Sequence, residues 1–208
     1  MVQVKICGLS TTETMTAALD AGADLVGLVF FAKSPRNVSL LQAKTLAEQA
    51  RGRAKIVALV VDADDETLGA IVAHVRPDYI QAQGHETPTR IAEIKALTNI
   101  AVIKAISVSD KKDVGAAALY GNADLILFDA KPPKDALPGG NGLTFDWAVL
   151  PRNQVFMLAG GLNAGNVAAA IRRTSAAYVD VSSGVETSPG IKDVTLIRKF
   201  IEAARAAR

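Results

Sequence analysis

The chain has 208 residues, half of them hydrophobic, which suits one domain with a single large core. Its formal net charge is only +2, and the basic residues lie mostly near expected helix ends, so no nucleic-acid surface is indicated. It contains one cysteine, which excludes an internal disulfide and is typical of a reducing compartment. No run of about 18 apolar residues and no signal-like start is present, so we expect a cytoplasmic protein without a membrane segment.

Short runs rich in β-branched residues alternate with segments of helical period, which is typical of strand–helix units in a parallel sheet. We predict strands at residues 2–7, 24–30, 55–61, 79–83, 101–106, 124–129, 155–160 and 178–183. We predict helices at residues 11–21, 39–50, 64–75, 88–97, 110–119, 163–173 and 194–205. The expected helix caps are Ser10, Ser39, Asp64, Thr87, Ser109 and Asn163. The sixth crossover, TFDWAVLP, allows at most two turns before Pro151, so its helix should be short or irregular.

Eight such units fit either a closed (β/α)8 TIM barrel or an open, doubly wound sheet. No GxGxxG motif follows the first strand, whereas glycine-rich turns follow strands six, seven and eight. We therefore predict a barrel that spans residues 1–208 as a single domain. In a barrel, the functional groups lie at the carboxyl ends of the strands.

Cys7 ends the first predicted strand, and the alternation of side chains along a strand then turns Cys7, Lys5 and Gln3 toward the barrel interior. A buried Lys5 needs a partner, and Asp180 on the eighth strand can supply it. A lone buried cysteine usually only packs. At this strand end, however, a nearby cation can lower the thiol pKa, so Cys7 is a candidate base.

Asp129 follows a run of four apolar residues in LILFDAKPP and precedes the long loop AKPPKDALPGGNG. The carboxylate can serve as a turn or cap residue, or it can face a ligand under that loop. The loop is too long to be ordered without a purpose, which favours a ligand.

The segments after strands seven and eight, AGGLNAGN and SSGVETSPG, carry glycines and small hydroxyls where this fold often binds phosphate. The glycines and small hydroxyls of these two segments are candidate phosphate ligands. Together these loops favour a phosphate site more strongly than either does alone.

The loop FAKSPRNVS after strand two presents Arg36, which can be a surface residue or a fork for a planar carboxylate. His74 lies in a predicted helix and His85 in a loop, without paired ligand spacing, so we assign no metal site.

Five motifs occur in order between residues 4 and 193: KICG, FAKSPRNVS, FDAKPP with a later GNG, LAGGLN, and VDVSSGVETSPGIKD. Together they resemble phosphoribosylanthranilate isomerase of tryptophan biosynthesis. The resemblance implies a cofactor-free Amadori rearrangement with Cys7 as general base and Asp129 as general acid. It also implies that Arg36 holds the anthranilate carboxylate and that Gln81 and Asp180 contact the substrate. The phosphate ligands that it implies are Gly160, Gly161, Ser182, Ser183 and Gly184.

The sequence departs from that family at the fourth strand, where the usual Gln-Leu-His-Gly is replaced by Gln81-Ala82-Gln83-Gly84, with His85 one place beyond. The loop after strand six is also less glycine-rich than expected before Gly142. A local contact should differ, while Cys7 and Asp129 are unaffected.

Two alternatives follow from the same residues. One is another phosphate-binding barrel isomerase that acts on a phosphoribosyl metabolite, such as a histidine-pathway aminoaldose; those enzymes usually carry aspartate where this chain has Cys7. The other is a barrel that binds a phosphorylated metabolite without catalysis, which the presence of both Cys7 and Asp129 disfavours. The expected partner is a small molecule, and the sequence leaves monomer and homodimer open.

Overall fold

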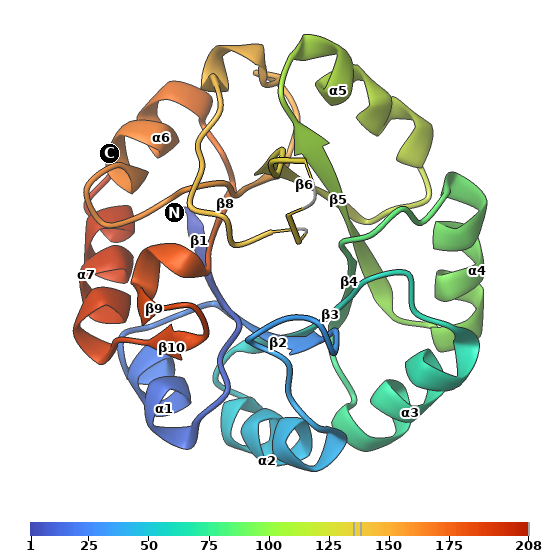
Figure 1. The fold of residues 1–208 in the computed structure, drawn as a ribbon. Coiled ribbons are helices and arrows are strands. Elements are labelled where there is room, and N and C mark those ends of the chain that lie inside the picture. The colour runs from blue at the N-terminus through green and yellow to red at the C-terminus, as the bar shows by residue number, and fades with distance from the viewer. Residues whose placement is uncertain (135, 138, 208) are drawn as a thin grey trace.

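The computed structural model describes residues 1–134, 136–137 and 139–207, and within them eight parallel strands form a closed barrel. Figure 1 looks along the barrel axis and shows the helices as a ring around the strands. The strands, in both chain and spatial order, are β1 (Gln3–Cys7), β2 (Leu25–Phe30), β3 (Lys55–Val60), β4 (Tyr79–Ala82), β5 (Ala101–Val108), β6 (Leu125–Ala130), β7 (Met157–Leu158) and β8 (Tyr178–Val181). The last strand pairs with the first, so the barrel prediction is confirmed and the open sheet is excluded.

The described residues form seven α-helices outside the barrel: α1 (Thr12–Asp20), α2 (Leu40–Ala50), α3 (Asp65–Val75), α4 (Pro88–Thr98), α5 (Lys111–Ala116), α6 (Val167–Thr174) and α7 (Val194–Arg205). The sixth crossover holds only the 3-10 turn η2 (Trp147–Val149), as predicted from Pro151. The segment after α5 tightens into a second 3-10 turn, η1 (Ala117–Tyr120). None of the described helices is both long and apolar enough to cross a membrane.

Three of the expected helix caps are confirmed, at Ser39, Asp64 and Thr87. Two others are wrong by one residue, because Thr11 caps α1 in place of Ser10 and Asp110 caps α5 in place of Ser109. Neighbouring hydroxyl and carboxylate side chains have nearly equal capping ability, so the sequence alone does not separate them.

The structure corrects the seventh strand, which covers only Met157–Leu158 instead of residues 155–160. Val155, at the start of the predicted range, is exposed and makes no ladder pairing. The following helix also starts late, at Val167, because the Asn163 side chain accepts a hydrogen bond from Gly165 in a turn and does not cap the helix.

Apolar side chains fill two layers. One lies between strands and helices and includes Val4 and Ile6 of β1. The second lies inside the barrel and consists of Leu25, Val57, Ile103, Ala105, Leu125, Leu127, Met157 and Ala159. The predicted orientation of β1 is therefore confirmed, because its even-numbered residues face the helices.

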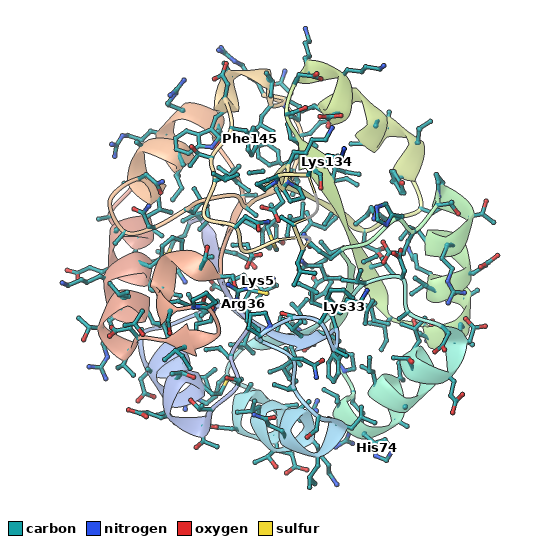
Figure 2. All side chains as sticks on the ribbon, in the orientation of Figure 1. Lys5, Lys33, Arg36, His74, Lys134 and Phe145 are labelled. Atoms are coloured by element: carbon teal, nitrogen blue, oxygen red, sulfur yellow. The ribbon has the colours of Figure 1, made fainter. Side chains whose placement is uncertain are left out.

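Lys5 and Asp180 form an ion pair inside the barrel, with 3.0 Å between Lys5 Nζ and Asp180 Oδ1. The two residues stand opposite each other in the β1–β8 register, which places both side chains on the inner face. Lys5 is fully buried, and Figure 2 shows its side chain in the middle of the molecule, while His74 lies at the outer rim. The pair predicted from strand alternation is thus confirmed.

We expect Lys5→Met to lower the free energy of unfolding by about 3–5 kcal/mol, because it leaves the Asp180 carboxylate buried without its partner. Urea unfolding at pH 7 measures this loss. The double variant Lys5→Met, Asp180→Leu should recover most of it, since both charges are then removed. Arg53→Met breaks an exposed pair with Asp20 and serves as the control. Equal losses in the Lys5 and Arg53 variants would contradict the prediction.

Candidate active site

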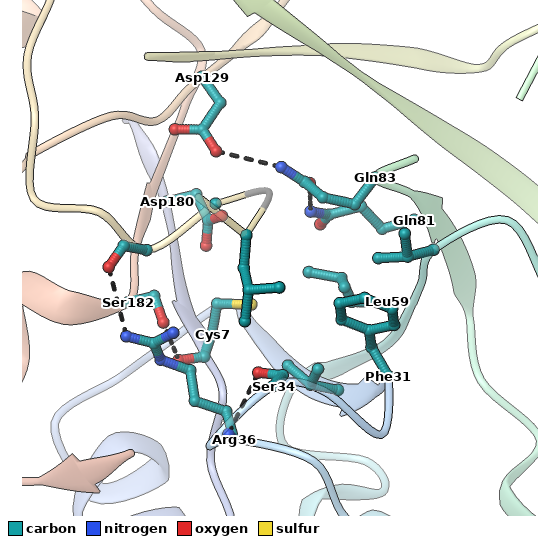
Figure 3. Close-up of a pocket in the computed structure, with 15 residues that line it drawn as sticks. Cys7, Phe31, Ser34, Arg36, Leu59, Gln81, Gln83, Asp129, Asp180 and Ser182 are labelled. Atoms are coloured by element: carbon teal, nitrogen blue, oxygen red, sulfur yellow. Dashed lines mark hydrogen bonds between the residues drawn. The ribbon is translucent and has the colours of Figure 1, made fainter. Parts of the chain in front are cut away.

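A pocket opens at the carboxyl ends of the strands and spans about 540 Å³ of space between atoms, part of which is open to solvent. Most of the predicted site residues lie around it: Cys7, Arg36, Gln81, Asp129, Asp180 and Ser182 (Figure 3). The long loop after β6 contributes Leu137, Gly139 and Gly140 to the same pocket, and Figure 1 shows this loop crossing the mouth of the barrel. Asp135 and Pro138 of that loop lie outside the described residues.

Cys7 is the last residue of β1, and its side chain is almost fully buried. Burial raises the pKa of its thiol above the usual value, and the charge of Asp180 raises it further. Lys5 acts in the opposite direction but does not outweigh burial. Lys5 therefore lowers the thiol pKa as expected, but the net shift of that pKa is upward because burial is the larger effect. Lys5 already neutralises Asp180, and the dry surroundings disfavour the thiolate.

Asp129 occupies the inner face of β6 and lines the same pocket as Cys7. Burial raises the pKa of its carboxyl from 3.8 to about 7, and the negative charge of Asp180 adds to the rise. Gln83 acts against this rise, because its side-chain Nε2 donates a hydrogen bond of 3.1 Å to Asp129 Oδ2. The carboxyl therefore exchanges its proton near neutral pH, which suits a general acid.

The order of these two pKa values determines which protonation state dominates. Above pH 7 and below the thiol pKa, the main form carries a neutral Cys7 and an ionised Asp129. A thiolate base together with a protonated acid is then the minor form with the same total number of protons. One proton moved from Cys7 to Asp129 produces that form.

A second pocket, of about 390 Å³, adjoins the first and is lined by Gly160, Gly161, Ser182 and Ser183. Gly160 has φ of +86°, and a Cβ there would lie 2.6 Å from the backbone nitrogen of Ala130. Gly184 stands just behind the pocket, where a Cβ would lie 1.9 Å from the carbonyl oxygen of Leu162. Only glycine fits these two positions, so the loops approach closely and turn backbone toward the pocket. The predicted phosphate residues are thus brought together.

Arg36 lies at the pocket, but Glu186 already occupies one edge of its guanidinium. Arg36 Nε and Nη2 donate to the two carboxylate oxygens of Glu186, both at 2.8 Å. Glu186 also accepts a bond of 2.6 Å from Lys192 Nζ, which donates further to Ser182. Arg36 Nη2 also donates to the Gly140 carbonyl oxygen at 3.4 Å. The arginine is therefore held as a fixed cation, and only its Nη1 group has no hydrogen bond to a described residue.

The sequence analysis missed three residues of this region: Gln83, Glu186 and Lys192. Gln83 stood out only as a departure from a motif, although it lies two residues after Gln81 and directly follows β4, so that both side chains face the pocket. Glu186 and Lys192 lie on the short hairpin β9 (Glu186–Ser188) and β10 (Ile191–Lys192), which follows the 3-10 turn η3 (Ser183–Val185). No hairpin signal was recognised in ETSPGIK, where Pro189 and Gly190 form the turn.

A family model described as N-(5'phosphoribosyl)anthranilate (PRA) isomerase matches residues 4–203 of the sequence. The chain belongs to this isomerase family. A curated relative from Bradyrhizobium sp. (strain ORS 278), named N-(5'-phosphoribosyl)anthranilate isomerase, is 54% identical over 209 residues, which cover 98% of this chain and 95% of the relative. The family resemblance found from the five motifs is therefore confirmed.

Solved structures of the isomerase family share the fold over nearly the whole chain. The crystal structure of phosphoribosyl anthranilate isomerase from Thermotoga maritima has a TM-score of 0.89 and 35% identity, covering 99% of each chain. A crystal structure of a phosphoribosyl anthranilate isomerase in complex with reduced 1-(o-carboxyphenylamino)-1-deoxyribulose 5-phosphate has a TM-score of 0.84 and 32% identity, again over 99% of each chain.

We expect Asp129→Asn to stabilise the protein at pH 8 but not at pH 4. The folded-state pKa lies above the ordinary value, so wild-type stability falls as the pH rises from about 4 through about 7. The gap from 3.8 to about 7 corresponds to a difference on the order of 4 kcal/mol at pH 8. Chemical unfolding at several pH values measures it. Asp20→Asn, at an exposed ion pair, is the control, and parallel curves for wild type and Asp129→Asn would contradict the prediction.

Proposed function

We propose that this protein converts N-(5'-phosphoribosyl)anthranilate into 1-(o-carboxyphenylamino)-1-deoxyribulose 5-phosphate, an aldose-to-ketose rearrangement in tryptophan biosynthesis. Membership of the isomerase family supports the choice of substrate. The observation that carries the chemistry is that Cys7 and Asp129 line one pocket from different strands, and that Asp129 titrates near neutral pH.

Two proton transfers complete the reaction without a cofactor. Protonated Asp129 gives its proton to the ring oxygen of the ribose as the C1′–O bond breaks, and the nitrogen lone pair forms an iminium. The Cys7 thiolate then removes the proton from C2′, and the electron pair of that C–H bond moves to give an enolamine. Tautomerisation of the enolamine yields the ketone at C2′. C1′ is reduced while C2′ is oxidised, so no outside oxidant or reductant is needed.

The required protonation state arises by a net shift of one proton from Cys7 to Asp129. This shift is uphill in the empty site, because burial raises the pKa of the Cys7 thiol above its usual value, whereas the pKa of the Asp129 carboxyl is about 7. The iminium formed on ring opening places a positive charge beside the thiol, which favours the thiolate at the step that uses it.

Groups remote from the reacting carbons position the substrate in this proposal. The phosphate binds at the loops that contain Gly160, Gly161, Ser182, Ser183 and Gly184, where the backbone approaches closely. Arg36 attracts the anthranilate carboxylate through its fixed charge and its Nη1 edge. Gln81 Oε1 is buried without a partner among the described residues, so we assign it a substrate hydroxyl or N–H as donor.

The proposal applies to a monomer as well as to a homodimer. The partner in this proposal is the small phosphoribosyl substrate alone. We also place the protein in the cytoplasm, which the single, unpaired cysteine supports.

We expect both Cys7→Ala and Asp129→Asn to lower kcat by at least about 100-fold, because each removes one of the two proton carriers. The loss of the substrate's fluorescence measures turnover. Asp20→Asn is the matched control for the carboxylate change and should keep wild-type rates. Undiminished turnover in either site variant would reject the role of that residue. An inactive wild type would reject catalysis and leave the non-catalytic binding barrel.

We expect Ser183→Asp to raise KM at least about tenfold with little change in kcat, because the new carboxylate repels the substrate phosphate in the second pocket. Inorganic phosphate should inhibit the wild type competitively and this variant more weakly. Ser175→Asp, at the far end of α6, adds the same charge away from the pocket and is the control. Equal KM values for the two variants would place the phosphate elsewhere.

A further inference from the structure

Among the described residues, Gln83 is the only one whose side chain donates a hydrogen bond to the Asp129 carboxylate, and its own amide is held by Gln81. Gln83 Nε2 donates to Asp129 Oδ2 at 3.1 Å, while Gln81 Nε2 donates to Gln83 Oε1 at 2.6 Å. All three side chains are buried. Because the oxygen of Gln83 is already engaged by Gln81, its NH2 group faces Asp129, and an NH2 group can only donate.

The backbone that carries Gln83 is held from several sides. The buried Glu86 carboxylate accepts from the backbone nitrogens of Asp62 and Gly84, at 2.9 and 3.1 Å. Lys104 forms a buried ion pair of 2.7 Å with Glu86 and donates to the Gly84 carbonyl at 2.8 Å. These contacts fix the turn directly after Gln83, so the side chain does not depend on a loose loop for its position.

We propose that Gln83 is a positioning residue that orients the Asp129 carboxyl and stabilises its ionised form through the side-chain amide. The proposal rests on the proposed function, in which Asp129 is the acid. With Oδ2 occupied by a donor, the proton that Asp129 transfers is carried on Oδ1. After the transfer, the Gln83 N–H stabilises the carboxylate that remains, which then accepts a new proton for the next turnover.

The charges around Asp129 do not supply the same contact. Asp180 of β8 is negative and raises the carboxyl pKa, while Lys5 of β1 lowers it but is tied to Asp180. Cys7 and Arg36 face the same pocket without a hydrogen bond to Asp129. Lys104 is a buried cation beside the turn that follows Gln83, and its Nζ already donates to Glu86 and to the carbonyl oxygens of Ala82 and Gly84. Gln83 is thus the neutral side-chain donor that offsets burial, and it acts together with the backbone N–H of Ala130.

Gln83→Met tests the proposal, because methionine keeps the length of the side chain and removes the donor. Carbon-13 labelled aspartate allows the Asp129 carboxyl to be titrated by NMR, with Asp129→Asn identifying its signal. In wild type the midpoint should lie near 7, and in Gln83→Met it should move to higher pH. The acidic limb of the pH profile of kcat/KM should move to higher pH by the same amount.

Gln83→His should restore the wild-type midpoint and acidic limb, because histidine Nε2 lies as many bonds from Cα as glutamine Nε2 and can donate to Oδ2. Gln154→Met removes an exposed amide and is the matched control, with no shift expected. An unmoved midpoint in Gln83→Met, or a shift that histidine fails to reverse, overturns the proposal.

The carboxyl titration does not depend on turnover, so it separates this inference from the proposed function. A wild type without isomerase activity would reject the function. An active wild type whose Asp129 midpoint and acidic limb stay in place in Gln83→Met would reject the role of Gln83 alone.

Discussion

Lys5 and Asp180 meet at the seam where the first and last strands of the barrel pair, directly beneath the proposed reacting groups. The pair satisfies a lysine that would otherwise be an isolated charge in the barrel interior. Asp180 also acts on the chemistry above it, because its negative charge raises the pKa of both Cys7 and Asp129. The closure of the barrel and the protonation of the site therefore depend on the same two side chains.

Burial raises the pKa of both proposed proton carriers, which helps the acid Asp129 and hinders the base Cys7. It holds the carboxyl of Asp129 near the pH at which an acid can give and regain its proton, and it makes the Cys7 thiol a weaker base in the empty pocket. Donors and charges at the pocket wall act on these groups as well. The hydrogen bond from Gln83 limits the rise in the pKa of Asp129, and Glu186 keeps Arg36 charged.

Strand alternation alone was sufficient to predict the Lys5–Asp180 pair, since period two and parallel register fix which side chains face inward. The same reasoning located Cys7 and Asp129 at strand ends. It did not give the direction of the Cys7 pKa, because the balance between burial and a neighbouring cation depends on depth in the folded protein. Gln83 and Glu186 were missed for a related reason: their importance comes from contacts across 46 and 150 positions of the chain, which local patterns do not encode.

The shortness of β7 has a consequence for motion. Met157 and Leu158 pair at only two positions with β6 and two with β8, whereas β5 and β6 pair over six. Pairing between neighbouring strands is therefore sparsest at β7. The backbone amides of β7 should exchange with solvent earlier than those of β5. Both glycine loops leave from this part of the wall, one after β7 and the other after β8. A substrate phosphate bound by both loops would connect the segments that follow β7 and β8. Substrate binding would then also stabilise the closed barrel at β7.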